Sequence, residues 1–224
     1  DYFRTFRLDE QYALVNLSCF EQLTEELVWT ILDMPSEKAR EFIQMLRMKG
    51  SNLDDCGNGC WQFTPLFRRF LARIIYKYMD QEKMKALYNR AMHYYEDKKN
   101  YFAALKFADL LKNREQIALQ IDRLLSQKLG YDVFLSLEEY CLHLSDVYLE
   151  EYPRLVMAKA MLQAMEGDLP AFRKCEQFLN RMLENCLPEK GRQIRKCQLF
   201  LKLIGPGGMT PELLEEAQEL ADQV

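Results

Sequence analysis

A short stretch around residue 60 limits the folds available to this chain more than any other feature. Residues 52–63 read NLDDCGNGCWQF, in which Gly-Asn-Gly precedes a segment that alternates apolar and polar side chains. A glycine-rich turn between two short segments of this kind predicts a β-hairpin, with strands near 52–54 and 60–63. Pro65 follows at once, and proline is favourable at the first helical position, where an N–H would have no helical partner. We therefore expect a hairpin that continues directly into a helix.

Helical apolar spacing lies on both sides of this hairpin. Thr24, followed by two glutamates, predicts the start of one helix, and Gly50 predicts the end of another. With the segment around 9–19, these patterns predict three short helices before the hairpin and one long helix after it. Three helices followed by a hairpin is the order of a winged-helix domain, which we assign to residues 1–78.

From residue 79 onward every long segment has helical spacing. Two pairs of helices resemble each other at an offset of about 67 residues, close to two periods of the 34-residue tetratricopeptide repeat (TPR). Ala104 and Ala108 in one pair, and Ala171 and Cys175 in the other, are small enough to let paired helices approach closely. We expect a mainly α protein, in which residues 79–224 form a TPR-like α-helical superhelix.

Composition and charge narrow the classes of function. The chain of 224 residues is 49% hydrophobic and 29% charged, which is ordinary for a globular protein with a core. The net charge is −4, with 20 basic and 18 acidic residues in 1–130, and 10 and 16 in 131–224. Neither part has the basic excess of a typical nucleic-acid binder. Seven scattered cysteines, without a signal peptide or membrane span, predict a reducing, cytoplasmic location without disulfides.

The residue types that carry catalysis are scarce. The only histidines are His93 and His143, and the second is two positions from Cys141, so the two side chains would point to different sides of a helix. Cys56 and Cys60 lie in the hairpin, but zinc would need two more ligands, and none is nearby in the sequence. We predict no enzyme activity, no metal and no cofactor in this chain.

Phosphate-binding loops are also absent from the sequence. The GPGG segment at 205–208 precedes a helix that we expect to begin at Thr210, but glutamates in its first turns would repel phosphate. The segment 68–90 is richer in basic residues, so direct contact with DNA is a third possibility. Basic side chains on one helix face more often serve only solubility.

Three motifs, taken in order, resemble the MalT-like regulators of the LuxR family, which are signal-transduction ATPases with numerous domains. The similarity covers most of residues 9–185. The matching residues are Phe63, Pro65, Leu66 and Phe67 in the first motif, Leu87, Ala91, Tyr94 and Tyr95 in the second, and Ala104, Leu105 and Ala108 in the third.

The resemblance implies a fragment of a bacterial transcription regulator. An upstream nucleotide-binding domain would bind ATP or ADP, the helical repeats would bind a small-molecule or protein effector, and a C-terminal helix-turn-helix domain would bind DNA. The family carries a histidine before Pro-Leu-Phe to sense the nucleotide. Thr64 occupies that position here, so it either senses nucleotide without carrying charge or only caps the helix.

Four aromatic residues are the candidates for the effector groove, although a place in the core is the favoured interpretation for each of them singly. They are Tyr88, Tyr95, Tyr101 and Phe107. The alternative to a regulator is a helical-repeat scaffold that binds a protein partner and has no role in transcription.

Overall fold

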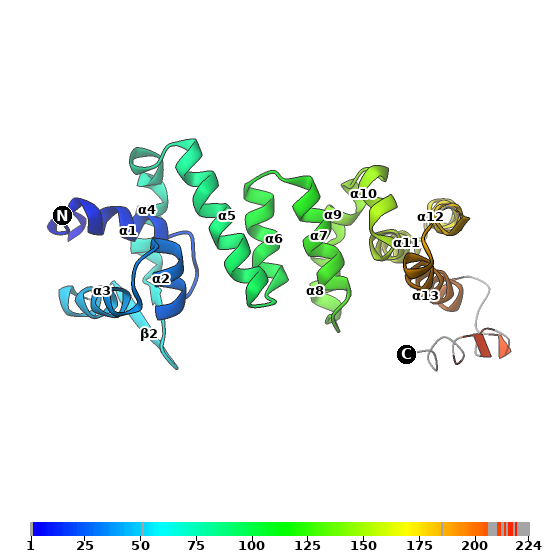
Figure 1. Ribbon diagram of the computed structural model, residues 1–224, viewed down its shortest axis with the longest axis horizontal. Helices are drawn as coiled ribbons and strands as arrows, with labels where there is room; N and C mark the ends of the chain where they lie inside the picture. Colours follow the sequence, from blue (N-terminus) through cyan, green and yellow to red (C-terminus); the bar gives the residue numbers. More distant parts are fainter. Residues whose placement is uncertain are drawn as a thin grey trace. The chain divides into compact units, whose positions relative to one another are not determined.

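In the computed structural model most of the chain is helical, and the strands form one small antiparallel sheet near the N-terminus (Figure 1). The structure describes residues 2–50, 52–184 and 186–205, and the single residues 210, 211, 213, 215, 216 and 218. Most of the predicted 205–208 loop and of the helix predicted from Thr210 lie outside these residues. Among the helices described, none is long and apolar enough to cross a bilayer.

Contacts divide the chain into two compact units, residues 1–111 and 112–224. The boundary that we predicted between residues 78 and 79 therefore falls inside the first unit. Helix α5 packs on α2 in that unit, and the Arg90 guanidinium on α5 donates to the Ile31 carbonyl on α2. The elements of the first unit are η1 (Tyr2–Thr5), α1 (Leu8–Leu17), β1 (Leu23–Thr24), α2 (Glu25–Leu32), α3 (Ser36–Lys49), β2 (Leu53–Gly57), β3 (Cys60–Phe63), α4 (Pro65–Tyr78), α5 (Gln81–Asp97) and α6 (Tyr101–Leu110).

The predicted hairpin is present, and it is part of a three-stranded sheet in the order β1-β3-β2. Leu23 of β1 pairs with Trp61 of β3, an antiparallel pairing that the sequence analysis did not anticipate. At the hairpin tip Gly57, Asn58 and Gly59 all have positive φ, which glycine adopts without strain and asparagine tolerates.

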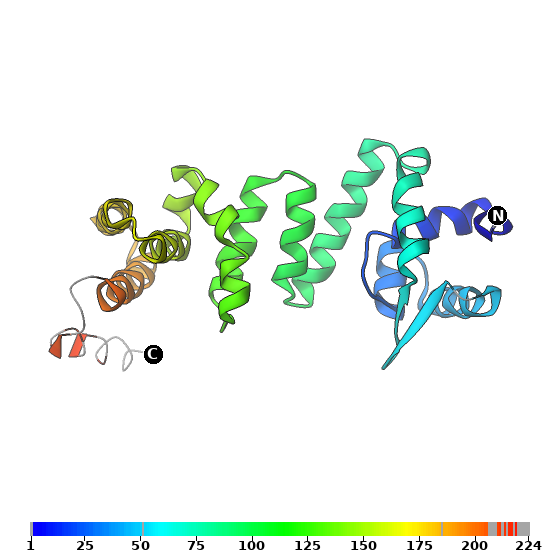
Figure 2. The same ribbon diagram turned by 180° about the vertical axis from the view of Figure 1, so that it is seen from behind.

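Helix α4 continues directly from this sheet, as Figure 2 shows. Pro65 is its first residue, and Phe67, Leu71 and Ile75 face the core. Leu66, the residue before Phe67, is 81% exposed and does not belong to this buried face.

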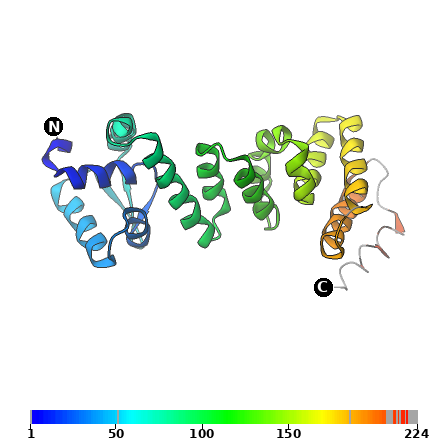
Figure 3. The same ribbon diagram turned by 45° about the horizontal axis from the view of Figure 1, so that its top comes forward.

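Helices α5 and α6 form an antiparallel hairpin within the first unit (Figure 3). The Asn100 side chain accepts a hydrogen bond from the Ala103 amide and so caps α6, as Asn113 caps the next helix, α7. Ala104 and Ala108 are fully buried, which agrees with the prediction that these small residues are covered by neighbouring helices.

The second unit is built around a helix that is buried on several sides. Its elements are α7 (Arg114–Leu125), α8 (Tyr131–Leu135), α9 (Glu138–His143), α10 (Asp146–Glu151), α11 (Pro153–Glu166), α12 (Leu169–Glu184) and α13 (Pro188–Ile204). Helix α11 contacts α7, α9, α10, α12 and α13. Leu155, Val156, Ala158 and Ala160 are all buried, and a helix that is apolar on most sides needs such neighbours.

Helices α11 and α12 form the second antiparallel hairpin, with its turn at Gly167. On α12 the buried residues are Phe172, Cys175 and Leu179, at positions i, i+3 and i+7. The repeat pattern predicted that α12 packs through Ala171 and Cys175. Cys175 is buried as predicted, but Phe172 is buried in place of Ala171.

Candidate functional site

Three of the four aromatic residues predicted for an effector groove lie together in the first unit. Phe107 on α6 is 5% exposed. Its ring centroid is 5.8 Å from that of Tyr95, 6.0 Å from that of Tyr88 and 5.4 Å from that of Phe20. Tyr101 is half-buried in the first turn of α6.

This cluster is part of the apolar core, and the phenols of Tyr88 and Tyr95 are partly exposed. Burial raises the pKa of Tyr88 and that of Tyr95 to about 12, and neighbouring acidic groups add to the shift. Both phenols are therefore neutral at physiological pH. A ligand on this face would meet only the exposed parts of Tyr88 and Tyr95, because Phe107 is covered.

Thr64 lies between β3 and α4, at the N-cap position of the helix. Its backbone N–H donates to the Asn52 carbonyl at 3.0 Å, which joins the ends of the two hairpin strands. The side chain is half-buried and does not cap α4, so its hydroxyl does not perform the capping role considered from the sequence.

The outer face of α4 is the most distinctive surface of the first unit. The helix has four basic residues and no acidic residue. Arg69, Arg73 and Lys77 follow one another at intervals of four residues, so they lie on one face of the helix. Leu66 and Phe70, which are 81% and 37% exposed, lie on the same face.

A cavity of about 510 Å³ opens beside this face. Arg69 and Arg73 line it together with Tyr2, Phe3 and Phe70. The rings of Phe3 and Phe70 meet edge to face, with centroids 5.4 Å apart. Guanidinium groups beside aromatic and aliphatic carbon suit an anionic group attached to an apolar one.

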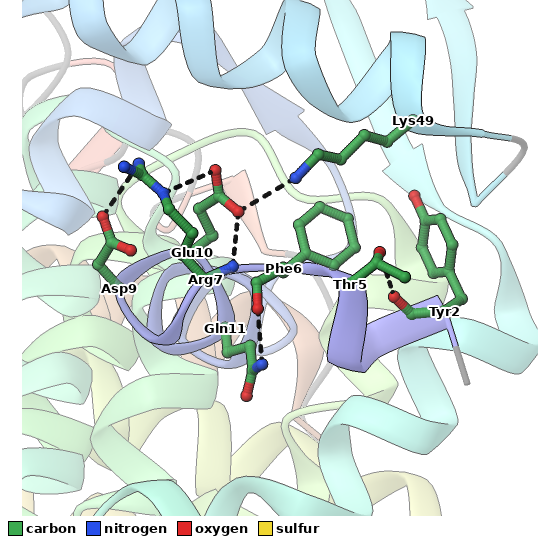
Figure 4. A network of polar contacts seen from close by, with 8 residues as sticks. All are labelled: Tyr2, Thr5, Phe6, Arg7, Asp9, Glu10, Gln11 and Lys49. Carbon is green, nitrogen blue, oxygen red and sulfur yellow. Dashed lines mark hydrogen bonds and ion pairs between the residues drawn. The ribbon is translucent and has the colours of Figure 1, made fainter.

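A polar network holds the N-terminal side of this cavity in place (Figure 4). Glu10 accepts hydrogen bonds from the Arg7 amide at 2.8 Å and from the Lys49 ammonium at 3.2 Å. The Lys49 ammonium also lies 4.5 Å from the centroid of the Phe6 ring. These contacts tie the segment that carries Tyr2 to the end of α3.

The Glu10 carboxylate is charged in this network. Burial by itself would raise its pKa, but the hydrogen bond from Arg7 and the charge of Lys49 outweigh burial, and the pKa is lowered. Gln11, the next residue, donates to the Phe6 carbonyl at 2.8 Å and accepts from the Tyr78 hydroxyl at 2.7 Å. The same short helix is thereby bonded to both α3 and α4.

The histidines and cysteines are not arranged as nucleophile and base. His143 Nδ1 lies 2.8 Å from the Glu139 carbonyl, while Cys141 is fully buried. His93 pairs with Glu96 on the exposed side of α5. Burial raises the pKa of Cys141 to about 12, so this thiol is not ionised at neutral pH.

The two hairpin cysteines are not a cross-strand pair, because Cys60 pairs with Gly57 and Cys56 lies at the bulge between Asp55 and Gly57. Burial raises the pKa of Cys60, and the neighbouring Cys56 adds to the shift. Within the described residues, no three histidine, cysteine or carboxylate side chains are grouped closely enough to hold a metal ion.

Sequence reasoning noted the basic residues of α4 and missed the cavity beside them. Tyr2 and Phe3 are separated from Phe70 by more than sixty residues, and no local pattern links them. The available signal was compositional, since α4 is a fourteen-residue helix without an acidic side chain.

Comparisons with known proteins found no matching family model, no matching curated protein and no matching solved structure. Any assignment of function therefore depends on the residues and geometry of this chain.

Proposed function

We propose that this chain is the winged-helix and TPR-like region of a cytoplasmic, MalT-like bacterial transcription regulator of the LuxR family. In this proposal an effector binds the helical repeats of the chain. The winged-helix part then changes its contact with an upstream nucleotide-binding domain, and a separate C-terminal domain binds DNA. The chain itself transmits the signal and catalyses no reaction.

The observation that carries the proposal is the pairing of β1 with β3. Winged-helix domains place a short strand between their first two helices, and that strand joins the sheet of the wing. Here Leu23 and Trp61 occupy the paired positions and are 1% and 8% exposed. The order α1-β1-α2-α3-β2-β3 supports this fold more strongly than the hairpin alone.

The two antiparallel helix pairs, α5 with α6 and α11 with α12, support the second half of the proposal. Ala104 on α6 and Cys175 on α12, two of the small residues in the predicted repeat pattern, are buried. The α5–α6 pair is part of the same compact unit as the sheet. A change at this first pair therefore has a short physical route to the winged-helix part, through the contact of Arg90 with α2.

The outer face of α4 fits the docking surface that the proposal requires. Its cations and its exposed Leu66 and Phe70 suit an acidic surface that also carries an apolar side chain. Thr64 lies at the start of the same helix. Its hydroxyl could donate a hydrogen bond to a nucleotide phosphate, but it would lack the charge of the family's histidine.

The test uses the full-length parent protein and amide hydrogen exchange. Effector binding is expected to change protection in β3 and in the first two turns of α4. The variant Arg69→Glu is expected to remove this coupling, because it reverses a charge on the docking face. Lys38→Glu is the matched control, since Lys38 is exposed on α3 outside the cavity.

Unchanged protection of α4 under saturating effector would refute the switch. The flanking sequence separates the regulator from the scaffold alternative. A P-loop upstream and a helix-turn-helix downstream support the regulator, and their absence supports the scaffold.

A further inference from the structure

A second cavity of about 510 Å³ lies entirely within the second unit, between α7, α11 and α13. Its basic residues are Arg154, Arg192 and Lys196. The apolar part of its lining includes Met157 and Phe200. Neither the resemblance to a regulator family nor the predicted groove residues pointed to this place.

One of the three cations is held in a fixed orientation. The Arg154 guanidinium contacts the Asp122 carboxylate at 2.7 Å, and their side chains are 30% and 14% exposed. A guanidinium held by a carboxylate on one side keeps its remaining N–H donors directed elsewhere. Arg154 is therefore preorganised to bind a second oxyanion.

The other two cations are exposed and make no ion pair with any residue that the structure describes. Arg192 and Lys196 are four residues apart on α13, so their charges lie on one face of the helix. Like charges at this spacing repel each other and destabilise a helix. An anion bound between them would remove that repulsion.

The charges and shape of the cavity select among possible ligands. Asp122 offsets one of the three cations, which leaves two positive charges to be balanced. Met157 and Phe200 add an apolar wall, and Phe200 is 38% exposed. A ligand that matches both parts has two negative charges and an apolar body.

The cavity is suited to binding and not to covalent chemistry. Cys197 is the only thiol in its lining among the described residues, and it is 3% exposed. Burial raises the pKa of this thiol to about 12, so it is not a nucleophile at neutral pH.

We propose that this cavity binds a small organic dianion. Its oxyanion group lies among Arg154, Arg192 and Lys196, and its apolar part lies against Met157 and Phe200. A phosphate monoester and a dicarboxylate share the required chemistry. The inference names a site and a chemical class for the effector, so it depends on the proposed function only for the regulatory consequence of binding.

The binding test uses the 224-residue chain and titration calorimetry at pH 7.5, where a phosphate monoester carries close to two charges. Phenyl phosphate and phenylsuccinate are the dianionic probes, and benzyl alcohol is the neutral one. We expect saturable binding of at least one dianion, and the tighter of the two identifies the oxyanion. Saturable binding of neither probe would overturn the proposal.

Variants locate the site. Arg192→Gln combined with Lys196→Gln is expected to weaken binding at least about tenfold, because two charge-assisted contacts are lost. Arg173→Gln combined with Lys174→Gln is the matched control, since it removes the same two kinds of charge from exposed residues of α12 that do not line the cavity, and it should change affinity by less than about twofold. An equal loss in the control would overturn the proposal, because it would show only general charge attraction.

A third variant tests the apolar half of the site. Phe200→Ser is expected to weaken phenyl phosphate severalfold and to leave inorganic phosphate unchanged. Equal effects on both probes would overturn the assignment of the apolar wall. If a dianion binds saturably but the amide hydrogen exchange of α4 in the parent protein does not change, the binding site stands and its role as the effector site is refuted.

Discussion

Replacing Phe107 by alanine is the sharpest test of whether the aromatic cluster of the first unit is core or groove. Truncating a buried phenylalanine typically costs about 3–5 kcal/mol, from lost burial and from the cavity left behind. Phe107 is 5% exposed and has three aromatic neighbours within about 6 Å. Aromatic pairs add about 0.5–1.5 kcal/mol each beyond burial, so we expect a loss in the upper half of that range.

The assay is urea unfolding followed by tryptophan fluorescence. The sequence has two tryptophans, Trp29 and Trp61, and both lie in the first unit, so the signal reports that unit alone. A domain of this size has a free energy of unfolding of about 5–15 kcal/mol, so the expected loss is a large fraction of it. The urea midpoint should fall clearly while the slope of the transition stays unchanged.

Phe102→Ala is the matched control, because Phe102 lies on a different face of the same helix, α6. Phe102 is 38% exposed, and the Lys106 ammonium lies 5.5 Å from its ring centroid. Losing this exposed contact should cost less than about 1 kcal/mol. If Phe107→Ala costs no more than Phe102→Ala, the ring is not a core residue, and a groove open to ligand becomes the better interpretation.

Three further predictions concern charge and backbone conformation. Glu10→Gln should lower the free energy of unfolding at pH 7 by about 1 kcal/mol. Because the pKa of Glu10 is lowered by folding, the difference from wild type should shrink as pH falls below the usual glutamate range, and a difference independent of pH would contradict this. Arg154→Met should cost about 2–3 kcal/mol at pH 7, since it leaves the Asp122 carboxylate unpaired in a mostly buried place. Burial already raises the pKa of Asp122, so this variant should regain stability as pH is lowered towards 5, and adding Asp122→Asn should restore part of the loss at pH 7. Gly59→Ala should cost about 1 kcal/mol in urea unfolding, because the residue has φ +71° and nothing within 4 Å that an added methyl would meet, whereas Gly130→Ala, at φ −68°, should cost nothing.

The features predicted well from the sequence depend on neighbouring residues. Thr24 caps the helix that was predicted to begin there, with a hydrogen bond of 3.1 Å from the Leu27 amide. The hairpin tip was found from its glycines, and the mainly helical character followed from periodicity. Each of these signals is contained within a few residues, so one sequence suffices to read it.

The features that were missed depend on residues far apart in the chain. Strand β1 has only two residues, too few to show an alternating pattern, and its partner Trp61 lies in the hairpin beyond two helices. Residues far apart in the chain also form the ion pair of Asp122 with Arg154 and the contact of Phe3 with Phe70.

The net charge of −4 says little about binding at any one site, because charge acts locally. Helix α4 has four basic residues without an acid, and α13 carries Lys190, Arg192, Arg195, Lys196 and Lys202 with one acid, Glu189. Lys202 pairs with Glu216 at 3.4 Å, but at physiological ionic strength charges are screened beyond about 8 Å, so acidic residues farther away do not cancel the remaining excesses. Each helix also exposes an aromatic ring beside its cations.

A few cations beside an exposed aromatic ring favour small anions, or short acidic segments of a protein, over long polyanions. Two or three cations at a site release few counterions, so affinity should fall gently with salt, with a slope of about two to three. Contact with duplex DNA through a long basic surface would give a much steeper dependence. Steep salt dependence of binding to generic duplex would therefore show that α4 serves nucleic acid and not an acidic protein surface.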